Sequence, residues 1–384
     1  MGKSLEVNPQ KNKYIILSDF DIRSNNRGTA ALGYGAIKFL LQNGYIDNNY
    51  TILKISFYRN PFRKINKYVE KELDIYGVKW RHVSLNVFII DKYLLKYKML
   101  FWNRTFKQAI RNLELVAAIN GGDGLTDIYG NYMLYARLRE INLATYFHIP
   151  YIILPQTIGP FLEERNKDNI LKVLRGAEKV FVRDHNFDSE LKQANIPFEN
   201  TNDLSFFMKP MSFPVEIKHP AVGINLSGLA YSNKFGNLVG QFDNYPLLIE
   251  SLINNFKGKG FNVYIIPHSY NIQTPEENND DMLSSKEFYD RLKDKRMVFL
   301  IESDLISPQV KYIISQMDYF IGTRMHANFA AIFSHIPVFG LAYSYKFEGA
   351  FATNGLKDST FMINNMEVEQ IPSLIDIINK KFNL

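Results

Sequence analysis

Short apolar runs that end in polar or glycine-containing turns alternate with segments of helical periodicity along the sequence. This alternation is typical of parallel β-strands joined by crossover helices. Most of the runs are apolar on both faces, which indicates central strands in a sheet covered by helices. The predicted strands are 14–17, 51–56, 115–119, 151–154, 179–182, 221–225, 262–266, 297–299, 319–321 and 338–341. The predicted helices include 29–43, 131–147, 186–194, 245–257 and 307–316. The pattern therefore restricts the chain to an α/β fold.

A proline-rich break at residues 209–220 divides this alternation into two parts. Its mixed polar composition is typical of interdomain linkers. At 384 residues the chain is long enough for two domains that each bury a core. We predict a Rossmann-like domain at 1–212 and a second at 213–365 that face each other across a cleft, which is the architecture of many sugar-transfer enzymes. Apolar residues at helical spacing predict a C-terminal helix within 366–384 that crosses back to the first domain.

The composition excludes several classes of site and protein. The chain contains no cysteine, which excludes thiolate zinc sites, iron–sulfur clusters and a cysteine nucleophile. Two uncharged runs, 141–162 and 325–345, are about as long as a bilayer span, but prolines and polar side chains interrupt both. The first residues also lack the apolar core of a signal peptide. We therefore expect a cytoplasmic protein.

Polar residues follow several strands of the first domain, at the edge of the sheet where ligands of α/β folds bind. A loop that opens a helix presents N–H groups to an anion, and glycines let the backbone approach a ligand closely. A guanidinium at a strand exit binds a carboxylate or phosphate with two hydrogen bonds. The alternatives are an ordinary helix cap, a tight turn and a salt bridge between Arg183 and Asp184. The candidate residues are Asn26, Gly121, Gly122, Asp123, Gln156, Arg183 and Asp203.

The second domain carries the sharper signal. Strand 262–266 leads into His268, and strand 319–321 leads into Arg324 and His326, which are two residues apart at a strand-to-helix junction. This pair places a fixed cation beside a group that titrates near neutral pH. Recognition of a phosphate or carboxylate together with acid–base chemistry needs these residue types. A structural role for a lone histidine is the alternative.

A set of short motifs occurs in order along the chain, mostly at the predicted strand ends. The motifs are Asn26-Arg27-Gly28, Gly121-Gly122-Asp123, Pro155-Gln156-Thr157-Ile158-Gly159-Pro160, Val182-Arg183-Asp184, Asp203, Pro267-His268, Gly322-Thr323-Arg324-Met325-His326, Ile336-Pro337-Val338 and Tyr343-Ser344-Tyr345-Lys346. This ordered set resembles the polysaccharide pyruvyl transferase family over about residues 14 to 350. The proline–glutamine–glycine turn and the arginine–x–histidine motif are the most specific of the motifs. Two positions depart from the family pattern, Thr29 where many members have Asp and Met325 where Leu is usual.

The resemblance implies a GT-B-like two-domain enzyme. Such an enzyme moves the enolpyruvyl unit of phosphoenolpyruvate onto a sugar of a polysaccharide precursor, closes it into a pyruvate ketal and releases phosphate. By family analogy, Arg183 and Arg324 bind the donor from opposite domains and His326 is the acid–base catalyst. His268 then holds the phosphate or acts as a second acid, and the base is either Asp203 or Asp123. The remaining predicted substrate-binding residues are Asn26, Gly121, Gly122, Gln156 and Lys346. Phosphoenolpyruvate is a substrate here, and no cofactor or metal is implied.

Three other classes compete with this interpretation. A GT-B nucleotide-sugar glycosyltransferase would need an acidic residue for the ribose, for which Glu348 is the candidate. A non-catalytic scaffold is disfavoured because the arginines and histidines of the motifs are intact. Nucleic-acid binding is suggested only by a pI near 9.0, and the sequence lacks a zinc site, an RNA-binding module or a dense basic helix.

The positive charge of the chain is concentrated in one segment. Residues 51–111 contain 14 Lys and Arg against four Asp and Glu, a net charge of +10, whereas the whole chain has +6. Aromatic residues, including Trp80 and Trp102, lie between the cations. This composition suits an anionic membrane surface and a diphosphate-linked acceptor, with a solvated helical face as the alternative. We expect a basic–aromatic insertion on the acceptor side that contacts the inner face of the cell membrane. The acceptor sugar and the oligomeric state stay open.

Overall fold

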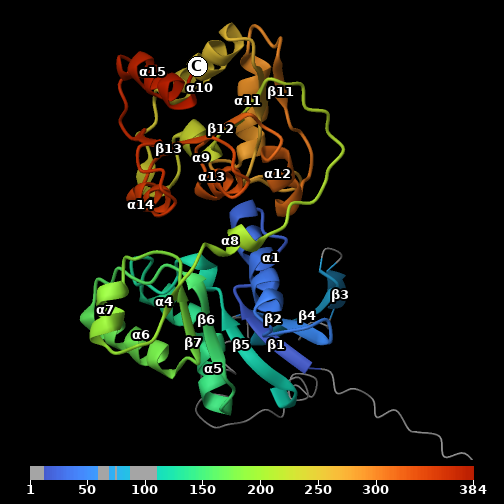
Figure 1. The fold of residues 1–384 in the computed structure, drawn as a ribbon, viewed down its shortest axis with the longest axis vertical. Helices are drawn as coiled ribbons and strands as arrows, with labels where there is room; N and C mark the ends of the chain where they lie inside the picture. The colour runs from blue at the N-terminus through green and yellow to red at the C-terminus, as the bar shows by residue number, and fades with distance from the viewer. Residues whose placement is uncertain (1–12, 59–68, 74–75, 87–109) are drawn as a thin grey trace, which may run out of the picture. The chain divides into compact units, whose positions relative to one another are not determined.

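The computed structural model of the chain describes residues 13–58, 69–73, 76–86 and 110–384, and Figure 1 shows its fold. The chain divides into two compact units. The first unit contains Met1–Phe20 and Ala36–Asp203, and the second contains Asp21–Gly35 and Leu204–Leu384. Each unit is an α/β domain with its own sheet and its own core.

The first unit is built on an eight-stranded sheet with the order β3-β4-β2-β1-β5-β6-β7-β8. Its neighbouring strands are parallel except for β3, which is antiparallel to β4. The strands are β1 (Lys13–Ser18), β2 (Tyr50–Tyr58), β3 (Val69–Leu73), β4 (Val78–Asn86), β5 (Leu113–Ala118), β6 (Tyr151–Gln156), β7 (Lys179–Val182) and β8 (Glu199–Asn200). The helices of this unit include α4 (Asn131–Arg137), α5 (Arg139–Phe147), α6 (Glu164–Gly176) and α7 (Asp188–Gln193), and α1 (Arg27–Gln42) contributes its second part.

The second unit is built on a six-stranded parallel sheet with the order β11-β10-β9-β12-β13-β14. The strands are β9 (Ala221–Asn225), β10 (Asn262–Ile265), β11 (Val298–Leu300), β12 (Tyr319–Gly322), β13 (Val338–Ala342) and β14 (Thr360–Met362). The helices include α8 (Leu204–Phe207), α9 (Gly228–Ser232), α10 (Tyr245–Gly258), α11 (Asp281–Arg291), α12 (Ser307–Ile314), α13 (Met325–Ile332), α14 (Tyr345–Thr353) and α15 (Gln370–Phe382). One core cluster includes side chains of α10 and α15, and the other includes side chains of α12 and α13.

The predicted strands are confirmed, because each corresponds to an observed strand with shifted ends at most. The sequence pattern missed β3, β4, β8 and β14. These strands lie at or next to the edges of their sheets, where one-sided or short pairing leaves no continuous apolar run. The single helix predicted at 131–147 is two helices, α4 and α5, separated at Leu138.

The prediction that the C-terminal helix crosses back to the first domain is wrong. The apolar face of α15, with Leu374 and Ile378, packs into the core of the second unit, and Asn379 exchanges hydrogen bonds with Asn255 of α10 (3.0 and 3.1 Å). An N-terminal segment, Asp21–Gly35, belongs to the second unit instead. The units divide between Asp203 and Leu204, whereas the sequence placed this boundary at residue 212.

Much of the basic–aromatic segment 51–111 lies outside the described residues, including Trp102. Trp80 is described, and it is a core residue that is 8% exposed and packs edge-to-face on Phe20, with the ring centroids 6.3 Å apart. Trp80 therefore does not contribute to an exposed aromatic surface. Within the described ranges, no helix has the length and apolar character needed to cross a bilayer.

Candidate active site

Arg324 lies at the junction between β12 and α13, where it is the N-cap residue of the helix. Its N–H donates to Asn225 Oδ1 at the end of β9 (2.8 Å). Asn328 Nδ2 donates to the carbonyl oxygens of Gly322 and Arg324 (2.9 and 3.2 Å). Both asparagines are fully buried, so the backbone on which Arg324 stands is fixed from two sides.

The guanidinium of Arg324 is held by a buried carboxylate. Nε and Nη2 donate to Asp281 Oδ1 (3.0 and 2.7 Å), and Nη2 also donates to the carbonyl and side-chain oxygens of Asn279 (both 2.8 Å). Burial opposes the charge, but Asp281, followed by Tyr343, more than offsets it and raises the pKa of Arg324. Within the described part of the chain, Nη1 has no hydrogen-bond acceptor. Arg324 is thus a fixed cation with one nitrogen left for an anion.

His268 follows β10 and is only 3% exposed. Burial lowers its pKa well below the usual value, and the nearby His326, Arg27 and Arg324 lower it further. The imidazole is therefore neutral near pH 7 and can donate one N–H bond, but it adds no positive charge. Since His326, Arg27 and Arg324 all act on the pKa of His268, these two arginines and two histidines lie close together at one end of the sheet.

His326 lies in the first turn of α13, where its ring packs edge-to-face on Phe329 with the centroids 5.6 Å apart. Gly28 of α1 lies directly against it. A Cβ on Gly28 would be 2.5 Å from His326 Nδ1 and 2.6 Å from its Cγ. A side chain at position 28 would occupy the space of the imidazole, which gives a steric reason for glycine there.

Asn26 and Arg27 build the loop that carries Gly28. Asn26 Oδ1 accepts from the Gly28 N–H (2.9 Å), which makes Asn26 the helix cap that the sequence left as an alternative. Arg27 is 6% exposed and donates to the carbonyl oxygens of Leu305 and Tyr270 (2.7 and 3.1 Å). Its guanidinium also lies over the Tyr270 ring, 4.0 Å from the centroid. Arg27 therefore anchors the loop to the second unit.

Arg183 in the first unit is part of a buried ion pair. Its Nη1 donates to Asp203 Oδ2 (2.5 Å) and its Nε to Thr157 Oγ1 (3.0 Å). The two charged side chains are 9% and 3% exposed. Burial opposes the charge, but Asp203, followed by Asp123 and Asp184, raises the pKa of Arg183. The sequence named Asp184 as the alternative ionic partner, whereas the observed partner is Asp203. Asp184 accepts instead from the Thr157 hydroxyl.

The glycine turn after β5 is a short 3₁₀ segment. Asn120, Gly121 and Gly122 have positive φ angles of 49°, 63° and 84°, which glycine adopts readily. The buried Asn120 Oδ1 accepts from Ser18 Oγ at the end of β1 (3.0 Å). Thr157 donates its N–H to the Gly122 carbonyl (2.8 Å). The turn thus joins the carboxyl ends of β1, β5 and β6.

Gln156 and Asp123 differ in exposure. Gln156 is fully buried, and its Nε2 donates to the carbonyl oxygens of Ala118 and Leu154 (2.9 and 3.1 Å). Its side chain therefore links β5 to β6. Asp123 is partly exposed and accepts from the Tyr129 hydroxyl (2.8 Å), so the edge of the turn is acidic.

The profile of the polysaccharide pyruvyl transferase family matches residues 26–345. The chain belongs to this family. No curated protein matches the sequence. The fold resembles a putative UDP-N-acetylglucosamine 2-epimerase from Listeria monocytogenes (TM-score 0.56, 11% identity, 97% of this chain and 90% of that chain). It also resembles the UDP-GlcNAc 2-epimerase from Methanocaldococcus jannaschii (TM-score 0.51, 12% identity, 97% of this chain and 91% of that chain). At these identities the likeness shows the fold, which is the predicted two-domain GT-B type.

The motif residues of this pyruvyl transferase family member are divided between the two units. The second unit brings Arg324, His326 and His268 together, and the first unit carries Arg183 beside Asp203. Lys346 lies in α14, and its side chain is outside the described residues. The residues that sequence reasoning missed are Asp281, Asn225 and Asn279. Asp281 stands at the start of α11, which reads as an ordinary acidic first turn, so no signal connected it to Arg324.

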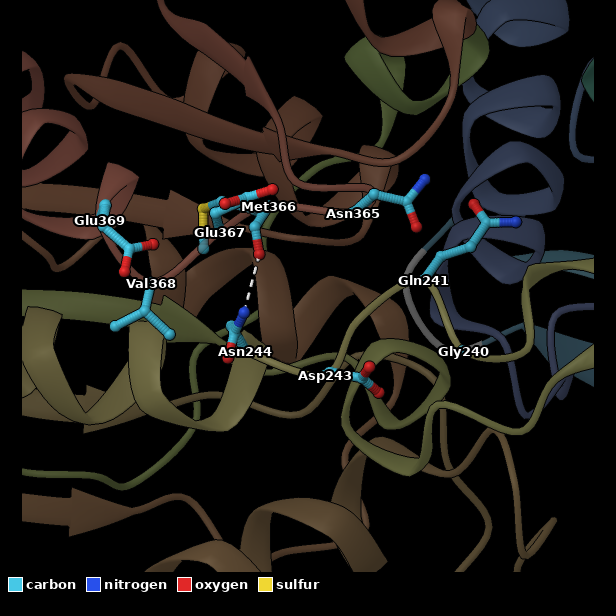
Figure 2. A pocket seen from close by; sticks show the side chains of 9 residues that line it. All are labelled: Gly240, Gln241, Asp243, Asn244, Asn365, Met366, Glu367, Val368 and Glu369. Carbon is cyan, nitrogen blue, oxygen red and sulfur yellow. Dashed lines mark hydrogen bonds between the residues drawn. The ribbon is translucent and has the colours of Figure 1, made fainter.

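A polar hollow of about 370 Å³ lies elsewhere in the second unit. Figure 2 shows the side chains that line it, with Asn244 Nδ2 donating to the Met366 carbonyl (2.9 Å). The lining residues are Gly240, Gln241, Asp243, Asn244, Asn365, Met366, Glu367, Val368 and Glu369. It contains none of the motif residues. In the ranges that the structure describes, no group of three or more His, Asp or Glu side chains is placed to hold a metal ion.

Proposed function

We propose that the protein transfers the enolpyruvyl group of phosphoenolpyruvate onto a saccharide of a polysaccharide precursor and closes it into a pyruvate ketal. The observation that carries the proposal is the second-unit cluster of Arg324, His268 and His326. A cation fixed by Asp281 lies there with a neutral histidine and a second histidine. Membership of the pyruvyl transferase family supports the same chemistry.

Arg324 suits the donor because phosphoenolpyruvate is a small anion with a carboxylate and a phosphate. Nη1 of Arg324 offers a charge-assisted hydrogen bond, and α13 begins at Met325, so the positive end of that helix dipole adds to the attraction. Neutral His268 supplies a hydrogen-bond donor without repelling the cation. Arg183 is a second cation for the donor or for a charged acceptor, since the described residues supply no acceptor for its Nη2.

The reaction proceeds in two additions to the same carbon. His326 protonates the methylene carbon of phosphoenolpyruvate while a sugar hydroxyl attacks C2, which gives a phosphorylated hemiketal. The C2–O bond to phosphate then breaks, phosphate leaves, and a second hydroxyl of the sugar attacks the oxocarbenium-like carbon. Of the two hydroxyl protons, one restores the protonated His326 and the other leaves on the released phosphate as HPO₄²⁻. The net change converts phosphoenolpyruvate and a diol into a pyruvate ketal and phosphate.

Asp123 is the better of the two predicted bases. Asp203 is 4% exposed, and its carboxylate is committed to Arg183 at 2.5 Å. Asp123 is partly exposed, so a hydroxyl of a bound saccharide reaches it more readily. We assign Asp203 to positioning Arg183 and Asp123 to accepting the hydroxyl proton.

The proposed reaction also implies the cellular compartment in which the protein works. Phosphoenolpyruvate is made in the cytoplasm, so a phosphoenolpyruvate-dependent transferase works there. The basic segment 51–111 would then contact anionic lipids on the inner face of the membrane. Loss of vesicle binding on neutralising Lys92, Lys96 and Lys98, which lie outside the described residues, tests this part.

Thermal unfolding in the presence of ligands tests the donor. Phosphoenolpyruvate at a concentration of about 100 Kd should stabilise the wild-type protein by ~2.7 kcal/mol, and UDP should not stabilise it. Arg324→Lys keeps a positive charge beside Asp281 but loses the two-nitrogen grip, and it should lose most of the phosphoenolpyruvate effect. Stabilisation by UDP and not by phosphoenolpyruvate would instead identify a nucleotide-sugar enzyme.

A further inference from the structure

Asp281 is a fully buried carboxylate that joins the ends of three strands in the second unit. Oδ1 accepts from the Gly228 N–H (2.8 Å), in the segment that follows β9. Oδ2 accepts from the N–H groups of His268 and Ser269 after β10 (3.1 and 2.9 Å). Arg324 follows β12, the third strand, and donates to Asp281 through Nε and Nη2. One side chain thus ties together the loops that carry the proposed donor-binding residues.

The arrangement fixes the direction of the Arg324 side chain. Asp281 takes Nε and Nη2 from one side, and Asn279 takes Nη2 with two oxygens. Only Nη1 is left without an acceptor among the described residues. An unrestrained arginine loses considerable rotamer freedom when it binds a ligand, and a guanidinium that is already held avoids that loss.

Close approach of the α11 backbone makes this contact achievable. A Cβ on Gly228 would be 2.3 Å from the Asp280 carbonyl oxygen and 2.8 Å from its nitrogen. Because position 228 is glycine, the start of α11 can lie against the start of α9. The backbone therefore places Asp281 where it meets all three strand ends.

We propose that Asp281 is a positioning residue for the reaction: it holds Arg324 and the His268 loop so that Arg324 Nη1 meets the anionic group of the donor. Asp281 itself does not touch the substrate. The identity of that anion as phosphoenolpyruvate rests on the function proposed above, whereas the positioning role requires only that an anion binds Arg324.

The alternative is that Asp281 only stabilises the fold. The chain offers a matched control in the adjacent Asp280, which is 2% exposed. Asp280 accepts from the N–H groups of Leu283 and Asn271 (2.9 and 2.8 Å) and makes no bond to Arg324. Asp280→Asn therefore weakens a helix cap and leaves the contacts of the Arg324 guanidinium unchanged. Asp281→Asn removes the negative charge that holds this guanidinium.

Steady-state kinetics of phosphate release distinguish the two roles. Asp281→Asn should reduce kcat/KM for phosphoenolpyruvate by ~100-fold, mainly through KM, because a charge-assisted pair is lost beside the bound anion. Asp280→Asn should lower Tm and leave kcat/KM within about threefold of the wild type. In an Arg324→Lys background, Asp281→Asn should add little, because the two residues act as one unit. Equal kinetic losses in both aspartate variants, or an unchanged KM in folded Asp281→Asn, would overturn the proposal.

A milder variant covers the case in which Asp281→Asn does not fold. Asn279→Ala removes one acceptor of Nη2 and should raise KM about fivefold, roughly the effect of one lost hydrogen bond. Asn278→Ala, at the neighbouring position, is its control. An unchanged KM in Asn279→Ala would count against the role.

Binding of inorganic phosphate separates this proposal from the proposed function. If the wild type shows no turnover of phosphoenolpyruvate, the proposed function is wrong. Calorimetry still measures the affinity of the Arg324 site for inorganic phosphate in that case. Asp281→Asn should then bind phosphate at least about tenfold more weakly than Asp280→Asn. Equal binding by the two variants would refute the positioning role independently of the reaction.

Discussion

Replacing Gly28 with alanine tests the contact between α1 and His326. Alanine is the smallest change that adds a Cβ, and that atom would be 2.5 Å from Nδ1, 2.6 Å from Cγ and 2.8 Å from Cβ of His326. The clash reaches the Cβ, so a rotation of the ring alone cannot relieve it. Either α13 or the start of α1 has to shift.

The structure allows the stability and activity effects to be separated. To restore an ordinary contact of 3.4 Å, the imidazole must move by about 0.9 Å from its present 2.5 Å. A misplacement of this size costs about 100-fold in rate when the group is catalytic. Overpacking costs ~1–3 kcal/mol of stability, but alanine in a helix regains about 0.5–1 kcal/mol relative to glycine. We expect a large loss of kcat with a modest change in Tm.

The assay is phosphate release from phosphoenolpyruvate in the presence of a saccharide acceptor, with Tm measured on the same samples. Gly258→Ala is the control, because a Cβ at this position in α10 meets no atom within 4 Å. In a His326→Ala background, Gly28→Ala should cause no further loss of kcat, since the imidazole that it displaces is gone, even though the contact with the remaining Cβ at 2.8 Å persists. The reasoning is refuted if Gly28→Ala keeps kcat within about threefold of the wild type, or if its effect persists without the imidazole.

Three further changes probe the rest of the molecule. His326→Ala should reduce kcat far more than it weakens phosphoenolpyruvate binding in single-turnover and equilibrium measurements, because we assign proton transfer to this side chain, and equal effects would indicate a binding role. Asp203→Ala should destabilise the protein by about 3–5 kcal/mol in urea unfolding, because Arg183 stays buried without its counter-charge, whereas Glu199→Ala, which breaks the exposed pair with Lys179, should cost less than about 1 kcal/mol. Glu140 is 4% exposed, and burial, followed by the charge of Asp19, raises its pKa from 4.5 to about 8. Between these pH values the folded state holds a proton that the unfolded chain has lost, so the free energy of unfolding should fall by at most about 5 kcal/mol as the pH rises from 4.5 to 8. Glu140→Gln should remove this slope, and an unchanged slope would exclude Glu140 as its source.

The sequence predicted the parts of the fold that depend on local pattern. Strands such as β9 and β10 lie inside a covered sheet and are apolar on both faces. A continuous apolar run in the sequence therefore predicts them. Strand β4 alternates Val78, Trp80 and His82 with cations, and this period-two pattern was read as part of a basic segment. Its place next to the antiparallel edge strand β3 explains the mixed character.

The motif residues were also found from sequence, but their partners were not. Arg324 and Asp281 are 43 positions apart, and Arg27 and Leu305 are 278 apart. No periodicity connects residues at such separations, and a buried aspartate at a helix start looks like any N-terminal acid. The same reason explains why the loop of Arg27 was assigned to the first domain. Its membership of the second unit depends on hydrogen bonds that only the folded chain shows.

Nuclear magnetic resonance of the product tests the central claim most directly. The enzyme is incubated with phosphoenolpyruvate labelled with ¹³C at C2 and C3 and with a panel of hexosides that present two free hydroxyls. We predict a new quaternary ketal carbon coupled to a methyl carbon on the saccharide, one phosphate released per ketal, and neither signal with Arg324→Lys. Labelled phosphoenolpyruvate that stays intact across the panel, while the protein consumes a nucleotide sugar with the same hexosides, would contradict the account.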